Sequence, residues 1–191
     1  MLFPFEEIIA RTTLTAVSHA PFLKPIVAFF GSVAPWLIAA WFIVEMTRIK
    51  SFKLKFYYFA LAAMAIIISR GMITETVRNI FYVSRPFETL VMDPVISSAL
   101  TSGMPSGHMA LLFPIALTFI SMKKKKGIIV LALVMLVGAA RIVAGVHWLS
   151  DILVGLLAGA AGFLIARAIL PKKLSIEPVE HSGMDETKQL I

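Results

Sequence analysis

Long apolar runs separated by short polar segments dominate this sequence. Five of the runs are roughly 17 to 22 residues long and carry few charges, which is near the length that an α-helix needs to cross about 30 Å of hydrocarbon. They cover residues 25–44, 56–77, 106–122, 127–144 and 151–170. The pattern predicts an all-α, polytopic membrane helix bundle with about five spanning helices.

The two ends of the chain differ from these runs. In residues 1–20 the apolar side chains of Phe5, Ile8 and Ile9 share a helical face with Thr12, but Arg11 and several hydroxyl residues interrupt the segment. We therefore expect an interfacial helix there, with a sixth span as the alternative. We expect residues 1–170 to form a single membrane-embedded domain and the polar residues 171–191 to form a disordered cytoplasmic tail.

The connection between the second and third spans, residues 79–105, is rich in aromatic residues and prolines. Within it, residues 95–100 are expected to form a short helix with Pro94 in the first turn. The last span carries small residues at spacings that suit close helix packing. These are Gly155, Ala158, Gly159 and Gly162.

The composition agrees with a membrane protein. Hydrophobic residues make up 59% of the chain, against roughly 45 to 50% in soluble proteins, and the mean hydropathy is +0.88. The net charge of +7 does not indicate a nucleic-acid partner, because the basic residues are scattered between apolar runs. The absence of cysteine excludes disulfides, a thiol nucleophile and thiolate metal ligands.

The basic residues predict the orientation in the cytoplasmic (inner) membrane. Loops 46–55 and 123–126 each hold four of them, and Lys172 and Lys173 begin the tail. By the positive-inside rule these segments, including the C-terminus, are cytoplasmic. The opposite, outward side then receives the 79–105 connection, the 145–150 link and nearly all the polar residues of the spans. Arg70 is the exception, because it lies deeper in its span and has no predicted partner.

The outward residues have the chemistry needed to bind and cleave a phosphate ester without a metal or other cofactor. Three guanidinium groups, on Arg78, Arg85 and Arg141, match the charged oxygens of a phosphoryl group. Ser106 is placed to cap the third span, where the first-turn amides, including that of Gly107, would point at an anion.

Two histidines complete this set. His147 lies four residues before Asp151, so that this carboxylate can hold one ring nitrogen and leave the other free to attack phosphorus. His108 would then protonate the leaving oxygen and later activate water against the phosphohistidine.

Three motifs in this order resemble the signatures of the type 2 phosphatidic acid phosphatase superfamily, which also includes the vanadium haloperoxidases. The motifs are Arg78 with Arg85-Pro86, Pro105-Ser106-Gly107-His108, and Arg141 with His147 and Asp151. The resemblance implies a metal-independent lipid phosphatase. It makes His147 the nucleophile, Asp151 its orienting partner and His108 the general acid, with Arg78, Arg85, Ser106, Gly107 and Arg141 holding the phosphate.

The sequence departs from the family pattern at two positions. Arg78 stands where the family usually has lysine, and Ala140 where it usually has serine, so one hydroxyl hydrogen bond is missing. Among family members, small proteins with an outward-facing site resemble undecaprenyl pyrophosphate phosphatases, which recycle the polyprenyl carrier of cell-wall synthesis. The expected partners are thus a membrane lipid phosphate and the bilayer itself.

Two other functions stay open, and a third is disfavoured. Phosphatidylglycerophosphate and phosphatidic acid phosphatases of phospholipid metabolism use the same motifs, and the spacing of the residues does not separate them. A protein of another class, a transporter or a non-catalytic protein that binds anionic lipid through its arginines, is the second alternative. A vanadate-dependent oxidase is disfavoured, because members resembling that branch are soluble.

Overall fold

The computed structural model describes residues 3–97 and 101–170, and in this part of the chain all regular structure is helical. The all-α prediction is therefore confirmed. The tail expected at 171–191 lies outside the described residues. The elements are α1 (Phe5–His19), α2 (Leu23–Ala28), the π-helix η1 (Phe29–Val33), α3 (Ala34–Thr47), α4 (Phe52–Ile66), the π-helix η2 (Ile67–Thr74), α5 (Glu75–Ile80), α6 (Pro86–Leu90), α7 (Gly107–Met122), α8 (Lys124–Val143) and α9 (Leu149–Ile169).

Among the described residues, four continuous helical stretches are long and apolar enough to cross a membrane. They are Leu23–Thr47, which joins α2, η1 and α3; Phe52–Ile80, which joins α4, η2 and α5; Lys124–Val143; and Leu149–Ile169. Each contains or closely overlaps one predicted span. The remaining predicted span corresponds to α7, a shorter apolar helix.

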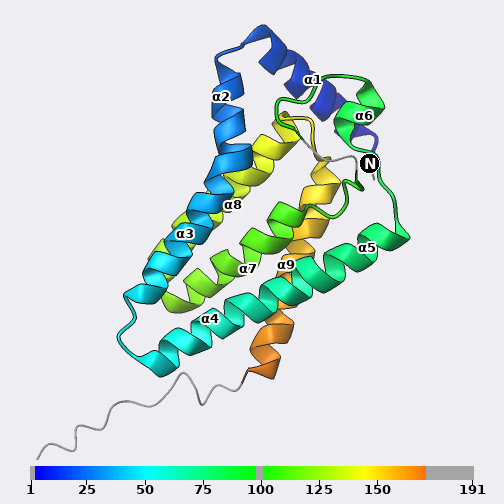
Figure 1. Ribbon diagram of the computed structural model, residues 1–191. Helices are drawn as coiled ribbons and strands as arrows, with labels where there is room; N and C mark the ends of the chain where they lie inside the picture. Colours follow the sequence, from blue (N-terminus) through cyan, green and yellow to red (C-terminus); the bar gives the residue numbers. More distant parts are fainter. Residues whose placement is uncertain (1–2, 98–100, 171–191) are drawn as a thin grey trace, which may run out of the picture.

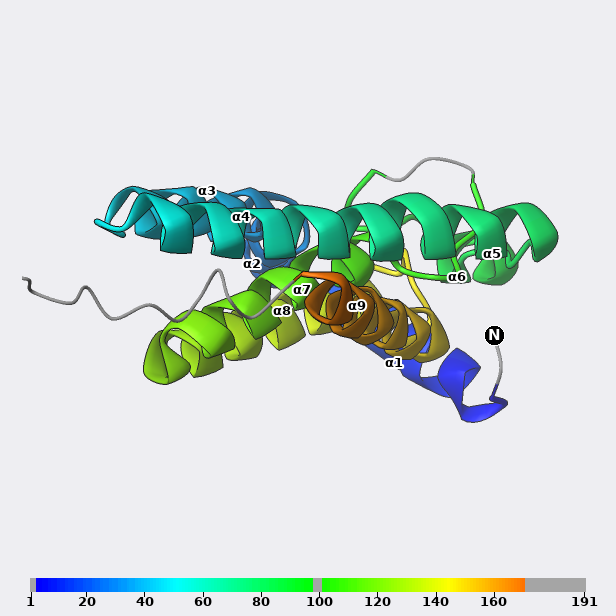
Figure 2. The same cartoon turned by 90° about the horizontal axis from the view of Figure 1, so that it is seen from below.

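Helix α7 is the centre of the bundle. It packs against α3, α4, η2, α8 and α9, and none of its residues is exposed. Figure 2 shows α3 and α4 to α5 in one layer, and α8 with α1 in the other. A helix that is apolar on every face is covered either by other elements or by lipid, and other elements cover α7. The first turn of α7 therefore begins inside the protein, next to the ends of its neighbours.

Helix α1 lies across one end of the bundle, as Figure 1 shows. It packs against α8 and α6 and is not among the membrane-spanning candidates. Its packed face is Glu6, Ala10, Leu14 and Val17. The apolar face noted in the sequence points away from the bundle, since Phe5 and Ile8 are exposed.

The prediction of a helix at 95–100 is wrong for the part that is described. Residues 95–97 are not helical, and residues 98–100 lie outside the described part. The short helix of this connection is α6, with Pro86 at its first position, where a proline costs no hydrogen bond. The Val95 amide instead donates to the carbonyl oxygen of Ala144, at 3.0 Å, which ties the connection to the end of α8.

The small residues of α9 allow close packing, as predicted. A Cβ at Gly155 would lie 2.7 Å from the carbonyl oxygen of Ser106, and one at Gly162 would lie 2.6 Å from that of Ala65. In the link before α9, Gly145 has a φ of +75° and faces Leu14 at a distance that leaves no room for a side chain. Both facts require glycine at this position. The backbone that carries His147 is thereby fixed against α1.

The connecting segments gather at two opposite ends of the bundle. The α3–α4 and α7–α8 loops lie at one end, whereas α1, α6 and the starts of α7 and α9 lie at the other (Figure 1). At the first end the buried carboxylate of Glu45 contacts Arg48 at 2.9 Å, Lys123 at 3.2 Å and Lys126 at 2.6 Å. Two of the four loop lysines therefore join α3 to the α7–α8 turn.

Candidate active site

The ends of four helices and two loops bring the predicted site residues together. Arg78 comes from α5, and Arg85 precedes α6. Ser106, Gly107 and His108 begin α7, Arg141 ends α8, and Asp151 lies in the first turn of α9 directly after His147. A hydrogen bond of 2.9 Å from the Ser106 amide to the carbonyl oxygen of Asp151 joins the starts of α7 and α9. Residues as far apart in sequence as Ser106 and Asp151 thus form one cluster.

His147 and Asp151 form the pair that the spacing predicted. The His147 Nδ1 atom lies 3.2 Å from Asp151 Oδ2, and both side chains are buried. The same carboxylate oxygen accepts a hydrogen bond of 2.8 Å from the Trp148 amide, at the N-cap of α9. Asp151 therefore fixes both the helix start and the imidazole ring. With Nδ1 donating to the carboxylate, Nε2 keeps its lone pair for another partner.

The surroundings of His147 favour its neutral form. Complete burial lowers the pKa of His147 well below its ordinary value, and the positive charges of Arg141, Arg85 and Arg78 lower it further. A hydrogen bond with the backbone of Gly103 opposes this shift. A neutral imidazole has the lone pair that nucleophilic attack requires.

His108 faces the guanidinium of Arg141. Arg141 Nη1 lies 3.4 Å from His108 Nε2 and donates to the carbonyl oxygen of Gly31 at 2.8 Å. Gly31 belongs to η1, so this hydrogen bond also holds the first spanning helix against the site. His108 is thus positioned at the first turn of α7 by a residue that the sequence predicts to bind phosphate.

Arg85 mainly holds the two loops together. It is 4% exposed, and its guanidinium donates to the carbonyl oxygen of Val146 at 2.8 Å and to that of Thr101 at 3.2 Å. A third contact of 3.4 Å reaches the Thr101 hydroxyl. Because a guanidinium has five N–H donors, two are left for a ligand. Arg78 is more open and donates to the carbonyl oxygen of Pro105 at 3.0 Å.

The prediction that the Ser106 side chain caps α7 is wrong. Ser106 is the N-cap residue, but its hydroxyl makes no capping hydrogen bond. It is completely buried, and its Oγ has no hydrogen-bond partner among the described residues. The Nε atoms of Arg78 and Arg141 share this state. A buried donor without a partner costs free energy, and here three such donors belong to residues predicted to contact phosphate.

The donor set suits an anion. Within the described part of the chain, no three histidine or carboxylate side chains lie together in a way that could hold a metal ion. Guanidinium groups, a hydroxyl and the start of α7 instead present N–H and O–H donors beside two imidazoles. This arrangement can bind a phosphate group, attack it with one histidine and move a proton with the other.

Sequence reasoning missed two contacts beside the site. Glu6 of α1 is buried and accepts hydrogen bonds from the Ser150 amide at 2.5 Å and the Ser150 hydroxyl at 3.2 Å. Arg70, for which the sequence showed no partner, forms an ion pair with Glu75. Glu75 also lies 3.6 Å from Arg78, which is the pairing that the three-residue helical spacing of the two residues indicates.

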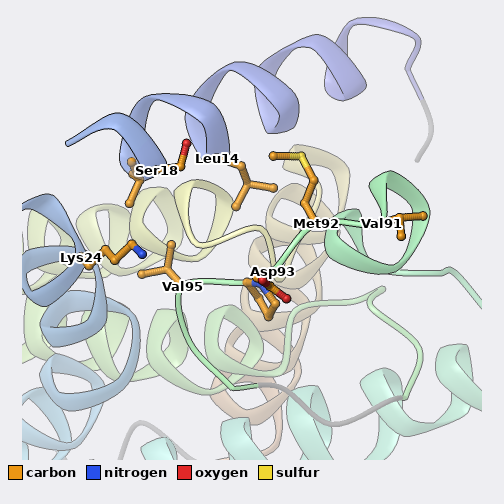
Figure 3. Close-up of a pocket in the computed structure, with 9 residues that line it drawn as sticks. Leu14, Ser18, Lys24, Val91, Met92, Asp93 and Val95 are labelled. Atoms are coloured by element: carbon orange, nitrogen blue, oxygen red, sulfur yellow. The ribbon is translucent and has the colours of Figure 1, made fainter. Parts of the chain in front are cut away.

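A separate cavity of about 430 Å³ lies between α1, the start of α2 and the chain after α6 (Figure 3). Leu14 and Ser18 line it from α1, and Lys24 lines it from α2. The far wall is the segment from Val91 to Val95. None of the predicted site residues lines this cavity, so it is distinct from the cluster around His147.

Comparison with known protein families matches residues 56–175 to the model of the PAP2 superfamily. This is the family whose motifs the sequence resembles. The matched range contains every predicted site residue. The match and the relatives described next indicate a phosphatase, a class of hydrolase, in agreement with the sequence prediction.

Two curated proteins have similar sequences. The "Putative undecaprenyl-diphosphatase YbjG" of Escherichia coli (strain K12) is 32% identical over 98 residues, which are 51% of this chain and 50% of that protein. The chain thus matches about half the length of this relative. The "Bacitracin transport permease protein BcrC" of Bacillus licheniformis is 29% identical over 78% of this chain and 73% of its own length.

A solved structure shares the fold. It is the crystal structure of a transmembrane PAP2 type phosphatidylglycerolphosphate phosphatase from Bacillus subtilis, which aligns with a TM-score of 0.64. The alignment covers 91% of this chain and 87% of the other, at 18% sequence identity. The likeness establishes a common membrane helix architecture.

Proposed function

Because this chain belongs to the PAP2 superfamily, we propose that it is an integral-membrane lipid phosphatase that releases phosphate from a polyprenyl pyrophosphate. The reaction takes place at the extracytoplasmic face of the cytoplasmic membrane and passes through a phosphohistidine. The three buried donors on Arg78, Ser106 and Arg141, which find no partner among the described residues, are the observation that carries this proposal. A phosphoryl group supplies the acceptors that they lack.

The proposed first step forms a bond between His147 Nε2 and the terminal phosphorus. Asp151 holds the opposite ring nitrogen, so the ring that becomes positively charged keeps its partner. The bond from phosphorus to the bridging oxygen breaks, and His108 gives that oxygen a proton. In the second step His108 takes a proton from water, and the water oxygen attacks the phosphohistidine. The bond from phosphorus to His147 Nε2 breaks, inorganic phosphate leaves, and both histidines return to their starting state.

The surface beside the site suits a lipid substrate. Ile80, Phe81 and Tyr82 are 65%, 58% and 65% exposed at the end of α5. Apolar and aromatic side chains of this kind are typical of the membrane interface. A lipid whose chains lie against this surface would bring its headgroup to Arg78, two residues before Ile80. The relative named as an undecaprenyl-diphosphatase supports the choice of a polyprenyl substrate.

The test is phosphate release by the purified protein from polyprenyl pyrophosphate, phosphatidylglycerophosphate and phosphatidic acid. Release should continue with excess chelator, and polyprenyl pyrophosphate should have the highest kcat/KM. His147→Ala should lose at least 10⁴-fold in rate, the order of magnitude known for catalytic triad members. Activity that disappears with chelator and returns with magnesium would contradict the metal-free mechanism.

A transporter is the second candidate, because one relative carries the name of a bacitracin transport permease. In that case the arginines would hold an anionic lipid without cleaving it. His108→Ala and His147→Ala would then keep function, whereas Arg141→Ala would lose it. In a phosphatase, both histidine variants lose turnover while still binding the lipid, which separates the two classes.

A further inference from the structure

A fourth guanidinium, on Arg70, lies next to the site although it belongs to none of the three motifs. A Cβ atom placed on Gly107 would be 2.8 Å from Arg70 Nε and 3.3 Å from its Cζ. Arg70 therefore lies against Gly107, the first residue of α7 and the one between Ser106 and His108. Its side chain is 35% exposed, against 16% for Arg78. The group is thus both close to the cluster and open to a ligand.

The π-helical turn of η2 determines this position. In an α-helix, residues three or four apart are neighbours, so residues five apart do not face each other. In η2 the wider turn brings Arg70 next to Glu75, and the Thr74 hydroxyl donates to the carbonyl oxygen of Ser69 at 2.8 Å. The Ser69 hydroxyl also lies 2.7 Å from the carbonyl oxygen of Ala110 in α7. π-Helical turns occur frequently at functional sites.

A diphosphate has two phosphates to accommodate, and the proposed reaction assigns the residues of the motifs to the terminal one. In the proposed reaction His147 attacks the terminal phosphate, and His108 protonates the leaving oxygen, which belongs to the lipid-linked phosphate. That second phosphate must therefore lie beside His108. Arg70 contacts Gly107, the residue before His108. The Glu75 carboxylate holds the Arg70 guanidinium in place and is 46% exposed. An incoming anion can therefore replace this carboxylate as the partner of Arg70.

We propose that Arg70 binds the lipid-linked phosphate of a diphosphate substrate and makes the enzyme prefer diphosphates to monoesters. This inference rests on the proposed function and names the part of the site that selects its substrate. In the free protein Arg70 pairs with Glu75. When the diphosphate binds, the guanidinium donates to the phosphate beside His108. A monoester such as phosphatidic acid has no second phosphate and makes no such contact.

The test compares kcat/KM for polyprenyl diphosphate with kcat/KM for phosphatidic acid. Arg70→Gln should lower the ratio of the two values about tenfold or more, as expected for one charge-assisted hydrogen bond. Glu75→Gln should keep the ratio, because it removes the resting partner of Arg70 and an ion pair of Arg78 that would affect both substrates alike. Arg11→Gln is the matched control, since Arg11 pairs with Glu7 on the exposed surface of α1, and it should leave the ratio unchanged.

Each outcome decides between the proposals. If Arg70→Gln lowers kcat/KM equally for the two substrates, Arg70 is a structural ion-pair residue and the inference is wrong. The same holds if Glu75→Gln lowers the ratio as much as Arg70→Gln does. If the wild type releases phosphate from neither lipid, the proposed function itself fails. The inhibition of lipid hydrolysis by inorganic diphosphate, compared with its inhibition by inorganic phosphate, gives a second measurement of the same preference. Arg70→Lys keeps the charge without the planar guanidinium and should give an intermediate preference for the diphosphate. A preference equal to that of the wild type would also contradict the inference.

Discussion

At the scale of single residues, His147 shows how one carboxylate serves two purposes. Asp151 Oδ2 accepts from the Trp148 amide at 2.8 Å and lies 3.2 Å from His147 Nδ1. The helix start therefore fixes the carboxylate, and the carboxylate fixes the ring. The four-residue spacing made this pairing predictable. The burial of the carboxylate and the ring depends on the packing of α7 and α9, so the spacing alone could not predict it.

The lowered pKa of His147 leads to a prediction about pH. We expect the His147 ring to stay neutral when the pH falls through 6.5, the ordinary range of histidine. The reason is complete burial beside three guanidinium groups. The measurement is ¹⁵N NMR of histidine-labelled protein in detergent micelles, with His147→Asn identifying the signal. A protonation midpoint at or above 6.5 would contradict the prediction.

The same shift has a consequence for stability. Because the pKa of His147 is lower in the folded than in the unfolded state, the unfolded chain binds more protons below about pH 6.5. The contribution of this residue is therefore fully present above that pH and decreases as the pH falls. His147→Asn should flatten this part of the pH dependence of thermal unfolding.

At the scale of elements, α1 supports the start of α9. The buried Glu6 carboxylate accepts from the amide and the hydroxyl of Ser150, the residue directly before Asp151. A carboxylate at a helix N-terminus satisfies amides that have no partner within the helix and interacts favourably with the helix dipole. Helix α1, which the sequence predicts to be interfacial, is thus part of the support of the candidate active site.

Glu6→Ala should lower the free energy of unfolding by about 1 to 3 kcal/mol, since it leaves polar groups at the start of α9 without their acceptor. It should also lower kcat, because Asp151 loses support. Thermal unfolding in detergent and phosphate release are the measurements. Glu7→Ala is the matched control, because Glu7 forms only an exposed pair with Arg11, which contributes about 0.5 kcal/mol or less. Equal effects of the two substitutions would contradict the role of Glu6.

At the scale of the whole molecule, the two ends of the bundle have different polar contacts. One end holds the cluster around His147, and the other holds Glu45 with Lys123 and Lys126. The orientation predicted from the basic loops places Glu45 at the cytoplasmic side. There the lysines hold α3 against the α7–α8 turn, in addition to the attraction to anionic lipid that their number suggests.

The orientation can be tested directly, because the chain contains no cysteine. Asp93→Cys and Lys125→Cys introduce single thiols at exposed positions on the two opposite sides. In intact cells a membrane-impermeant maleimide should label Asp93→Cys, and it should label Lys125→Cys only after the membrane is permeabilised. The unchanged protein is the control for background labelling. The reverse pattern would place the site on the cytoplasmic side.

The sequence by itself predicted the helical class, the positions of the long apolar helices and the residues that form the cluster around His147. These follow from local quantities: the length of an apolar run, the count of basic residues in a loop, and the spacing of His147 and Asp151. The family resemblance, which rests on the same motifs, agrees with the match to the PAP2 superfamily. The roles of the individual site residues stay predictions for the experiments above.

Only the tertiary structure decided how the helices share their surfaces. It placed α7 at the centre, left the Ser106 hydroxyl without a capping role, and paired Glu6 with Ser150 across 144 positions of the chain. It also gave Arg70 its partner through a π-helical turn, although α-helical periodicity separates residues 70 and 75. These contacts depend on packing between segments distant in sequence, and hydropathy or charge along the chain contains no information about which distant segments meet.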